Sequence, residues 1–171
     1  MSILETLSHL TLLFTLYSFI GWACESIFCS VIAKQWINRG FLNGPFCPVY
    51  GFGALLSIFC LSPFVGKLPF PWDYVLLYLA GVVILSILEY FTGWLLETLF
   101  RTKWWDYSNH KFQIHGRVCL TNALLFGLMA VILLQWIHPA AEWLLSLLPQ
   151  LVKFLLAGVL AAYFISDCVV T

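Results

Sequence analysis

The sequence predicts an all-α fold, a polytopic transmembrane helical bundle of about five spans with an internal parallel duplication of a two-helix unit. Hydrophobic residues make up 62% of the chain and charged residues only 9%, whereas soluble domains carry about 25% charged residues. Apolar runs recur at the ~20 residues needed to cross ~30 Å of hydrocarbon. The word Gly-Trp-x-x-Glu occurs twice, at Gly21–Glu25 and Gly93–Glu97. We therefore expect a single membrane domain over residues 1–171.

The spans are expected to be helices, because an open chain in lipid can satisfy its backbone groups in no other way. Pro139 is predicted to end the fourth span, and residues 140–150 to form a short interfacial helix anchored by Trp143. The first apolar run is too long for the roughly 7–15-residue core of a cleaved signal peptide. The predicted spans are, in order, residues 7–33, 47–66, 74–100, 119–138 and 151–171.

An alignment without gaps that superposes the two Gly-Trp-x-x-Glu words also aligns other identical residues. It places Phe19 on Phe91, Gly44 on Gly116 and Cys47 on Cys119. This predicts duplicated units over residues 17–61 and 89–133, with residues 151–171 as an additional C-terminal span. Since each unit holds two spans, the copies point the same way, as in transporters built from parallel repeats.

The distribution of Lys and Arg predicts the orientation of the chain. The first and third loops hold six basic residues and the opposite side holds two, Lys67 and Lys153. Cytoplasmic loops carry the excess of Lys and Arg. We therefore expect a multi-pass protein of the cell membrane with its N-terminus outside and its C-terminus cytoplasmic. The six basic residues are Lys34, Arg39, Arg101, Lys103, Lys111 and Arg117.

Three glutamates lie within predicted spans, where an ionisable side chain is costly and marks a functional site. Glu25 and Glu97 occupy equivalent repeat positions, and Glu89 lies near the middle of the third span. Polar residues at steps of three or four form one stripe on that span, which must face protein or water. The two repeats would then converge on a shared central cavity. The stripe consists of Ser86, Glu89, Tyr90, Gly93 and Glu97.

Two interpretations of these glutamates remain open. Glu25 and Glu97 could pair with Arg39 or Arg117 and lock the bundle, as buried ion pairs do. They could instead bind a ligand or a proton, and Glu89, with no basic residue close in sequence, is the stronger candidate for such a role. The candidate substrate-binding residues are Trp22, Glu25, Asn38, Arg39, Glu89, Glu97, Asp106, Tyr107 and Arg117.

Several classes of site are not expected. The six cysteines contain no CxxC pair, and His110 and His115 have no nearby cysteine pair to complete a zinc site. We expect no metal, no cofactor and no catalytic residue. The formal net charge of zero gives no electrostatic footprint for nucleic acid. Neither a G-x-x-x-x-G-K-[ST] phosphate loop nor a G-x-S-x-G elbow occurs, so any ATPase must be a separate chain.

The motif words resemble the bacterial family named putative ABC-transporter type IV permease. The resemblance covers about residues 17–127, and its one departure is Gln113, where the family pattern would have Asn. It implies a permease component of the bacterial inner membrane that works with a separate ATPase subunit. The words that carry it are Tyr-Ser-Phe-Ile-Gly-Trp-x-x-Glu (17–25), Asn-Arg-Gly-Phe-Leu-x-Gly-Pro (38–45), Pro-Val-Tyr-Gly (48–51), Trp-Asp-Tyr-Ser (105–108) and Gly-Arg-Val-Cys-Leu (116–120).

We therefore expect a transporter permease or substrate-capture subunit whose polar intramembrane site is built from symmetric glutamates. An alternative is a membrane-embedded enzyme acting on a lipid-linked or phosphate-bearing substrate at the cytoplasmic face. In that case Glu97 and Asp106 would be its acid and base, and Arg39 and Arg117 would bind phosphate. A third interpretation is a non-catalytic membrane assembly factor. A non-enzyme is favoured, with the lipid bilayer, a separate ATPase and further copies of the chain as expected partners.

Overall fold

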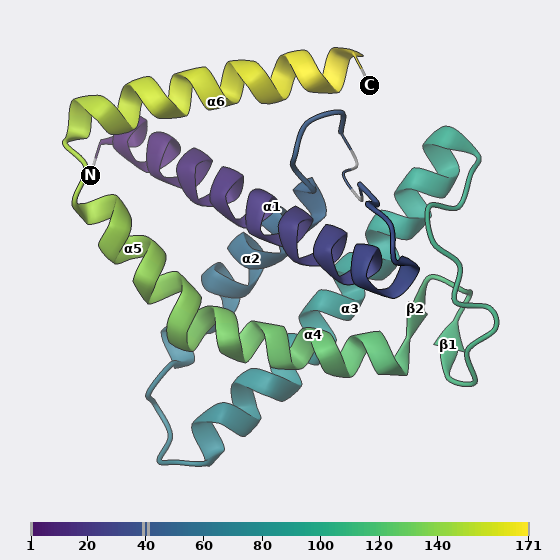
Figure 1. The fold of residues 1–171 in the computed structure, drawn as a ribbon. Coiled ribbons are helices and arrows are strands. Elements are labelled where there is room, and N and C mark those ends of the chain that lie inside the picture. Colours follow the sequence, from purple (N-terminus) through teal and green to yellow (C-terminus); the bar gives the residue numbers. More distant parts are fainter. Residues whose placement is uncertain (1, 39, 41, 171) are drawn as a thin grey trace. The chain divides into compact units, whose positions relative to one another are not determined.

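The structure of the protein is a computed structural model that describes residues 2–38, 40 and 42–170. Long helices dominate it, and the strands in this part of the chain are two residues each, so the predicted all-α class is confirmed (Figure 1). The elements are α1 (Ile3–Ala33), α2 (Pro48–Leu61), η1 (Ser62–Phe64), α3 (Trp72–Phe100), β1 (Gln113–Ile114), β2 (Val118–Cys119), α4 (Leu120–Ile132), the π-helical segment η2 (Leu133–Ile137), α5 (His138–Ser146) and α6 (Gln150–Val170).

Within the described residues, four helical stretches are long and apolar enough to cross a membrane. They are Ile3–Ala33, Trp72–Phe100, Leu120–Ser146 and Gln150–Val170. The predicted second span is a shorter apolar helix, Pro48–Phe64. Its α-helical part has 14 residues, which at 1.5 Å per residue is about 21 Å. Pro63 limits it, because proline disfavours an α-helical conformation in the residue before it. The orientation of the termini stays a prediction.

The prediction that the fourth span ends at Pro139 is wrong. Helical residues continue through Pro139 to Ser146, and the candidate span of this region is Leu120–Ser146. The π-helical segment η2 ends at Ile137, two residues before the proline, and His138 N–H donates to the Leu133 carbonyl five residues back. A proline removes an N–H and crowds the carbonyl four residues before it. The wider π turn gives this crowded backbone an alternative hydrogen-bond pattern.

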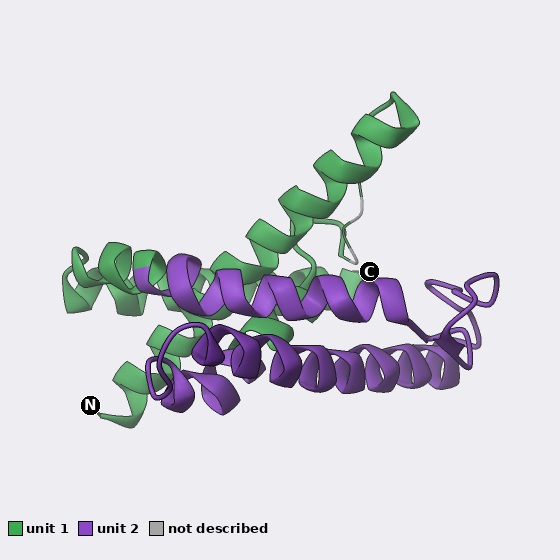
Figure 2. Ribbon diagram, turned by 90° about the horizontal axis from the view of Figure 1, so that it is seen from below, with its two compact units in different colours: residues 1–55, 140–171 green, residues 56–139 purple. Residues whose placement is uncertain are grey.

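The chain divides into two compact units, residues 1–55 with 140–171 and residues 56–139 (Figure 2). The second predicted repeat, 89–133, lies wholly in the second unit, and most of the first, 17–61, lies in the first unit. The duplication and the single membrane domain stay predictions.

In the first unit, α1 packs along α6. Helix α1 begins with a capping box, in which Ser2 and Glu5 each satisfy a backbone N–H of the other. Phe14 of α1 meets Phe164 of α6 with ring centroids 5.4 Å apart. These contacts fix the helix that carries the first Gly-Trp-x-x-Glu word.

In the second unit, α3 packs against α4 through small residues. A Cβ on Gly81 would come within 2.5 Å of Ala130, so only glycine allows this approach. Near the N-terminal end of α3, four buried residues from α2, α3, α4 and η2 form an apolar core. They are Leu61, Leu77, Val131 and Leu134. Beyond α3, β1 and β2 form an antiparallel hairpin that leads directly into α4.

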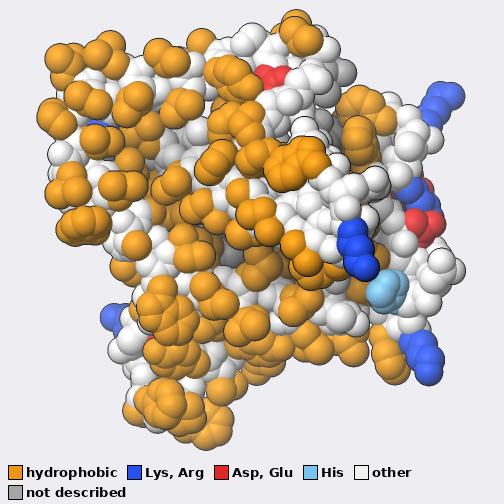
Figure 3. Space-filling model, viewed as in Figure 1, with side chains coloured by type: hydrophobic (Ala, Val, Ile, Leu, Met, Phe, Trp, Pro, Cys, Tyr) orange, Lys and Arg blue, Asp and Glu red, His pale blue; other side chains and the backbone are white. Residues whose placement is uncertain are grey.

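The composition of the surface supports the assignment as a membrane protein. Figure 3 shows hydrophobic side chains over most of the visible face, while charged and histidine side chains gather at the edge where β1 and β2 lie. Large hydrophobic residues of the spans are widely exposed, for example Val159 at 69% and Val83 at 57%. Such exposure suits contact with lipid and is unusual in a soluble protein.

Candidate functional site

The buried centre of the polar stripe on α3 is Glu89. Its side chain is 7% exposed. The Tyr107 hydroxyl donates a hydrogen bond of 3.1 Å to Glu89 Oε1, whereas Glu89 Oε2 is buried with no hydrogen-bond partner. Ser86 Oγ, three residues earlier on the same face, is also buried and unpartnered. The stripe therefore holds two polar atoms with unused hydrogen-bonding capacity.

Tyr107 belongs to the loop between α3 and β1, and the hairpin holds it in place. Its backbone N–H donates to the Gly116 carbonyl at 2.8 Å. Burial and the neighbouring Glu89 carboxyl raise the pKa of the Tyr107 phenol, while a hydrogen bond with Asn122 of α4 acts the other way. The phenol consequently keeps its proton and acts as a donor to Glu89.

Two turns further along α3, Glu97 pairs with Arg117. Arg117 donates to Glu97 Oε2 from Nε at 2.8 Å and from Nη2 at 2.6 Å. Arg117 Nη1 donates to the Tyr90 hydroxyl at 3.1 Å, and that hydroxyl also bonds His115 Nδ1 at 2.9 Å. The bonds and charge of Glu97 raise the pKa of the Arg117 guanidinium. Glu97 and Arg117 therefore form an ion pair, as in the first of the two interpretations that the sequence left open.

The loop itself is tightly built. Trp105 Nε1 donates to the Arg117 carbonyl at 2.9 Å. Gly116 has a φ of +70°, and a Cβ there would lie 2.6 Å from Asp106 Oδ1, so the turn requires glycine. Asp106 accepts from the backbone and hydroxyl of Ser108, and these bonds lower the pKa of its carboxyl group. Asp106 therefore acts as a turn former, and its exposed contact with Lys103 at 3.5 Å adds little.

Glu25 lies in the first unit. The Tyr50 hydroxyl of α2 donates to Glu25 Oε2 at 2.9 Å, and the Tyr50 ring packs against Gly21. Trp22 Nε1 donates to Asn38 Oδ1 at 2.6 Å, and Asn38 also accepts from the Gly40 N–H. Arg39, one of the two arginines considered as a partner for the glutamates, lies outside the described residues.

The structure thus brings the predicted site residues into two groups. One group lies in the second unit. It consists of Glu89 and Glu97 on α3 together with Asp106, Tyr107 and Arg117 from the segment between α3 and α4. Trp22, Glu25 and Asn38 lie in the first unit. The shared central cavity needs both units and stays a prediction. No group of three or more His, Cys, Asp or Glu in the described part of the chain could hold a metal ion.

Sequence reasoning missed two polar residues of the first unit. Asp167 of α6 is buried and accepts from the Gly44 N–H at 3.0 Å, which fixes the loop before α2. An acidic residue in an apolar span is itself a signal, and Asp167 could have been found in this way. The hydroxyl of Tyr50 gives no comparable signal, because tyrosine is common at the ends of spans.

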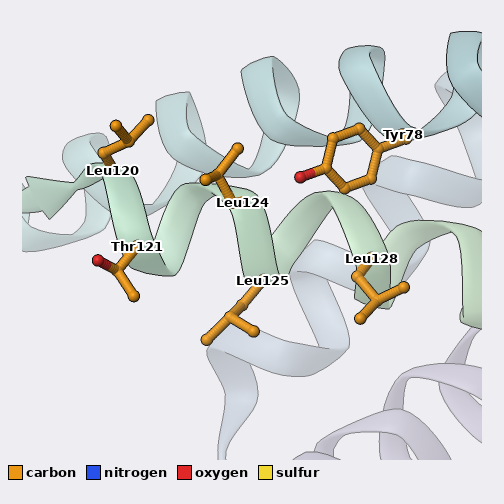
Figure 4. A pocket seen from close by; sticks show the side chains of 6 residues that line it. All are labelled: Tyr78, Leu120, Thr121, Leu124, Leu125 and Leu128. Atoms are coloured by element: carbon orange, nitrogen blue, oxygen red, sulfur yellow. The ribbon is translucent and has the colours of Figure 1, made fainter.

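One cavity lies away from these residues. It is a groove of about 440 Å³ in the second unit, formed by Tyr78 of α3 and side chains of α4 (Figure 4). Its walls are mostly leucine, and these leucines are about half exposed, so we interpret it as surface that faces lipid chains. It contains none of the predicted site residues. The lining residues are Tyr78, Leu120, Thr121, Leu124, Leu125 and Leu128.

Comparison with known proteins identifies the family. The chain belongs to the family described as "Putative ABC-transporter type IV", whose model matches residues 12–171. The match confirms the resemblance carried by the motif words and extends it through α6. No curated protein and no solved structure matches the chain. Together with the four long apolar helices, the family match makes this a membrane protein of a transporter-type family.

Proposed function

We propose that the chain is the membrane-spanning subunit of a transporter that works with a separate ATPase, and that the polar face of α3 contributes to its substrate path. The family description supports a transporter subunit. The observation that carries the site is the unpartnered Oε2 of Glu89, buried within a candidate span. A charged group at the bilayer centre costs at least ~2.5 kcal/mol, so such residues persist mainly where a pathway needs them.

The two glutamates on the polar face of α3 differ in how many of their hydrogen bonds are formed. Glu97 and Arg117 satisfy each other through two hydrogen bonds, which supports a structural role for this pair. Glu89 receives one hydrogen bond from Tyr107 and keeps one oxygen unused. A ligand gains most where a buried polar atom is otherwise unpaired. Glu89 is therefore the preferred contact, with Tyr107 beside it.

The alternative of an enzyme for phosphate-bearing substrates gains no support from Arg117 or Asp106. A phosphate at Arg117 would have to compete with Glu97 and Tyr90 for the same guanidinium. Asp106 has a lowered pKa, which makes it a poor general acid. The transporter proposal requires neither residue to react.

Purification of the tagged full chain from its native membrane in mild detergent tests the proposal. We expect a polypeptide with a phosphate-loop ATPase motif to co-purify, and the complex to hydrolyse ATP in lipid vesicles. Glu89→Gln should keep the complex but lower ATP hydrolysis about 10- to 100-fold, the equivalent of a lost hydrogen bond to a charged group of about 1.5–3 kcal/mol.

Glu142→Gln is the matched control, because it removes a carboxylate that bonds His9 in the other unit. ATP hydrolysis by this variant should stay close to that of the unchanged protein. Two results would overturn the proposal: a chain that purifies without any ATPase, or a complex whose ATP hydrolysis is indifferent to Glu89→Gln.

A further inference from the structure

The carboxyl group of Glu89 lies deep in the second unit, far from either end of its helix. Glu89 is eleven residues before Phe100, the last residue of α3, and this separation corresponds to about 16 Å along the helix axis. Its side chain is 7% exposed, and Oε2 is fully enclosed. Water therefore does not solvate this carboxyl group in the structure.

The groups that face Glu89 supply no positive charge. From the loop comes the Tyr107 phenol, and behind it lies the Cys119 thiol of β2, close enough to act on Tyr107. From α4 comes Asn122, a neutral amide that bonds Tyr107. On α3 itself the ionisable neighbours are Tyr90 and, two turns away, Glu97. The His110 ring lies against that of Tyr107, with centroids 5.6 Å apart, and Arg117 is paired with Glu97.

A carboxylate that loses its hydration without gaining a cation takes up a proton instead of keeping its charge. A proton needs no additional space, so it can bind where the side chain is fully packed. Ser86 Oγ, one turn earlier on the same face, is also buried and without a hydrogen-bond partner. Tyr107 already occupies Oε1 as a donor.

We propose that Glu89 is a proton-binding site, with the proton held on the carboxyl group beneath Tyr107. Tyr107 donates to Oε1, which leaves the buried Oε2 to carry the proton. Asn122 of α4 bonds Tyr107 in turn.

This inference goes beyond the proposed transport function, because it concerns the chain alone and is tested without an ATPase or a substrate. Infrared spectra of the full chain in lipid nanodiscs report the carbonyl stretch of a protonated carboxyl group. Exposed glutamates ionise near pH ~4.3, so they contribute no such band at neutral pH. We expect the unchanged protein to show the band and Glu89→Gln to lack it.

Glu97→Gln is the matched control, since it removes an ion-paired carboxylate from the same helix and should keep the band. Tyr107→Phe provides a second readout that does not depend on the folding of Glu89→Gln. Loss of the hydrogen bond to Oε1 should move the band to higher frequency. A neutral-pH spectrum without a protonated carboxyl band, or a band unchanged in both Glu89→Gln and Tyr107→Phe, would overturn the proposal.

Discussion

The two Gly-Trp-x-x-Glu words place a glutamate on a long apolar helix in each unit, and the donors to these glutamates include a tyrosine in one unit and an arginine in the other. Glu25 accepts from the hydroxyl of Tyr50, a neutral donor on the following helix. Glu97 accepts two bonds from the guanidinium of Arg117, which precedes the following helix. The repeated word thus determines where a carboxylate stands, whereas residues that follow each helix supply a donor to it.

The connecting segments of the two units are built differently. Residues 34–47 lead from α1 to α2, and Asp167 of α6 holds them through the Gly44 N–H. Residues 101–119 are longer and fold into their own hairpin, β1–β2. The hairpin presents Arg117 to Glu97 and fixes the loop that lays Tyr107 over Glu89. In the second unit, α3 therefore carries both an ion-paired carboxylate and a buried carboxyl group.

The largest expected effect comes from Arg117→Gln, which removes three hydrogen bonds from the hairpin to α3. Glu97 would lose its cation within a half-buried setting, and removal of one partner from such a pair is strongly destabilising. We expect the greatest fall in thermal midpoint among the variants discussed here, together with faster tryptic cleavage after Lys103 and Lys111. Lys103→Gln, which removes an exposed contact, should leave the thermal midpoint unchanged.

The second expected effect separates the two glycines of the repeated word. A Cβ on Gly21 would overlap the first atoms of the Tyr50 side chain, which cannot move without the backbone. A Cβ on Gly93 would lie 3.2 Å from the edge of the Trp105 ring and 3.5 Å from Arg117. Gly21→Ala should therefore lower the free energy of unfolding by about 1–3 kcal/mol through overpacking.

Gly93→Ala should be close to neutral, because a helix-favouring gain of about 0.5–1 kcal/mol offsets the mild crowding. Denaturant titration of both variants in the same detergent provides the measurement. Equal losses at the two positions would mean that the two words have the same packing environment, against the difference described here.

The sequence predicted much of the polar face in the second unit, because the helical spacing of polar residues shows which side chains share one face of a helix. Steps of three and four placed Glu89, Tyr90 and Glu97 on one face of α3, and the hairpin contacts that face. The sequence also named Arg117 as a partner of Glu97. It did not predict that Tyr107 covers Glu89, because a contact between a loop and a helix depends on how the loop folds and not on a local pattern.

Elsewhere in the chain, three features of the structure differ from the sequence prediction or were missing from it. Proline is a reliable helix breaker only when the preceding turn is α-helical, and the π turn before Pro139 removes that condition. Helix α2 falls short of a full span because Pro63 lies close behind it. Asp167 was not among the predicted site residues, although a single acid in an apolar run is a strong signal.

The smallest expected effect concerns Asp106, whose hydrogen bonds from Ser108 lower its pKa. A carboxyl group with a lowered folded-state pKa stabilises the turn above its ordinary value of about 3.9 and loses this effect as pH falls through the lower folded value. The Ser108 amide resonance, followed by NMR in micelles, should titrate with a midpoint below ~3.9. The Asp106→Asn variant should show no such titration. A midpoint at or above the ordinary value would contradict the turn described here.

The central claim is that Glu97 serves structure while Glu89 serves function, although both lie on the same face of α3. The direct test measures thermal stability in detergent and ATP hydrolysis of the purified complex for Glu97→Gln and Glu89→Gln side by side. We predict that Glu97→Gln lowers the thermal midpoint, because Arg117 loses its counter-charge. Glu89→Gln should keep the midpoint, because glutamine still accepts from Tyr107, and yet lose most of the activity. A Glu89→Gln protein that is both stable and fully active would contradict the claim.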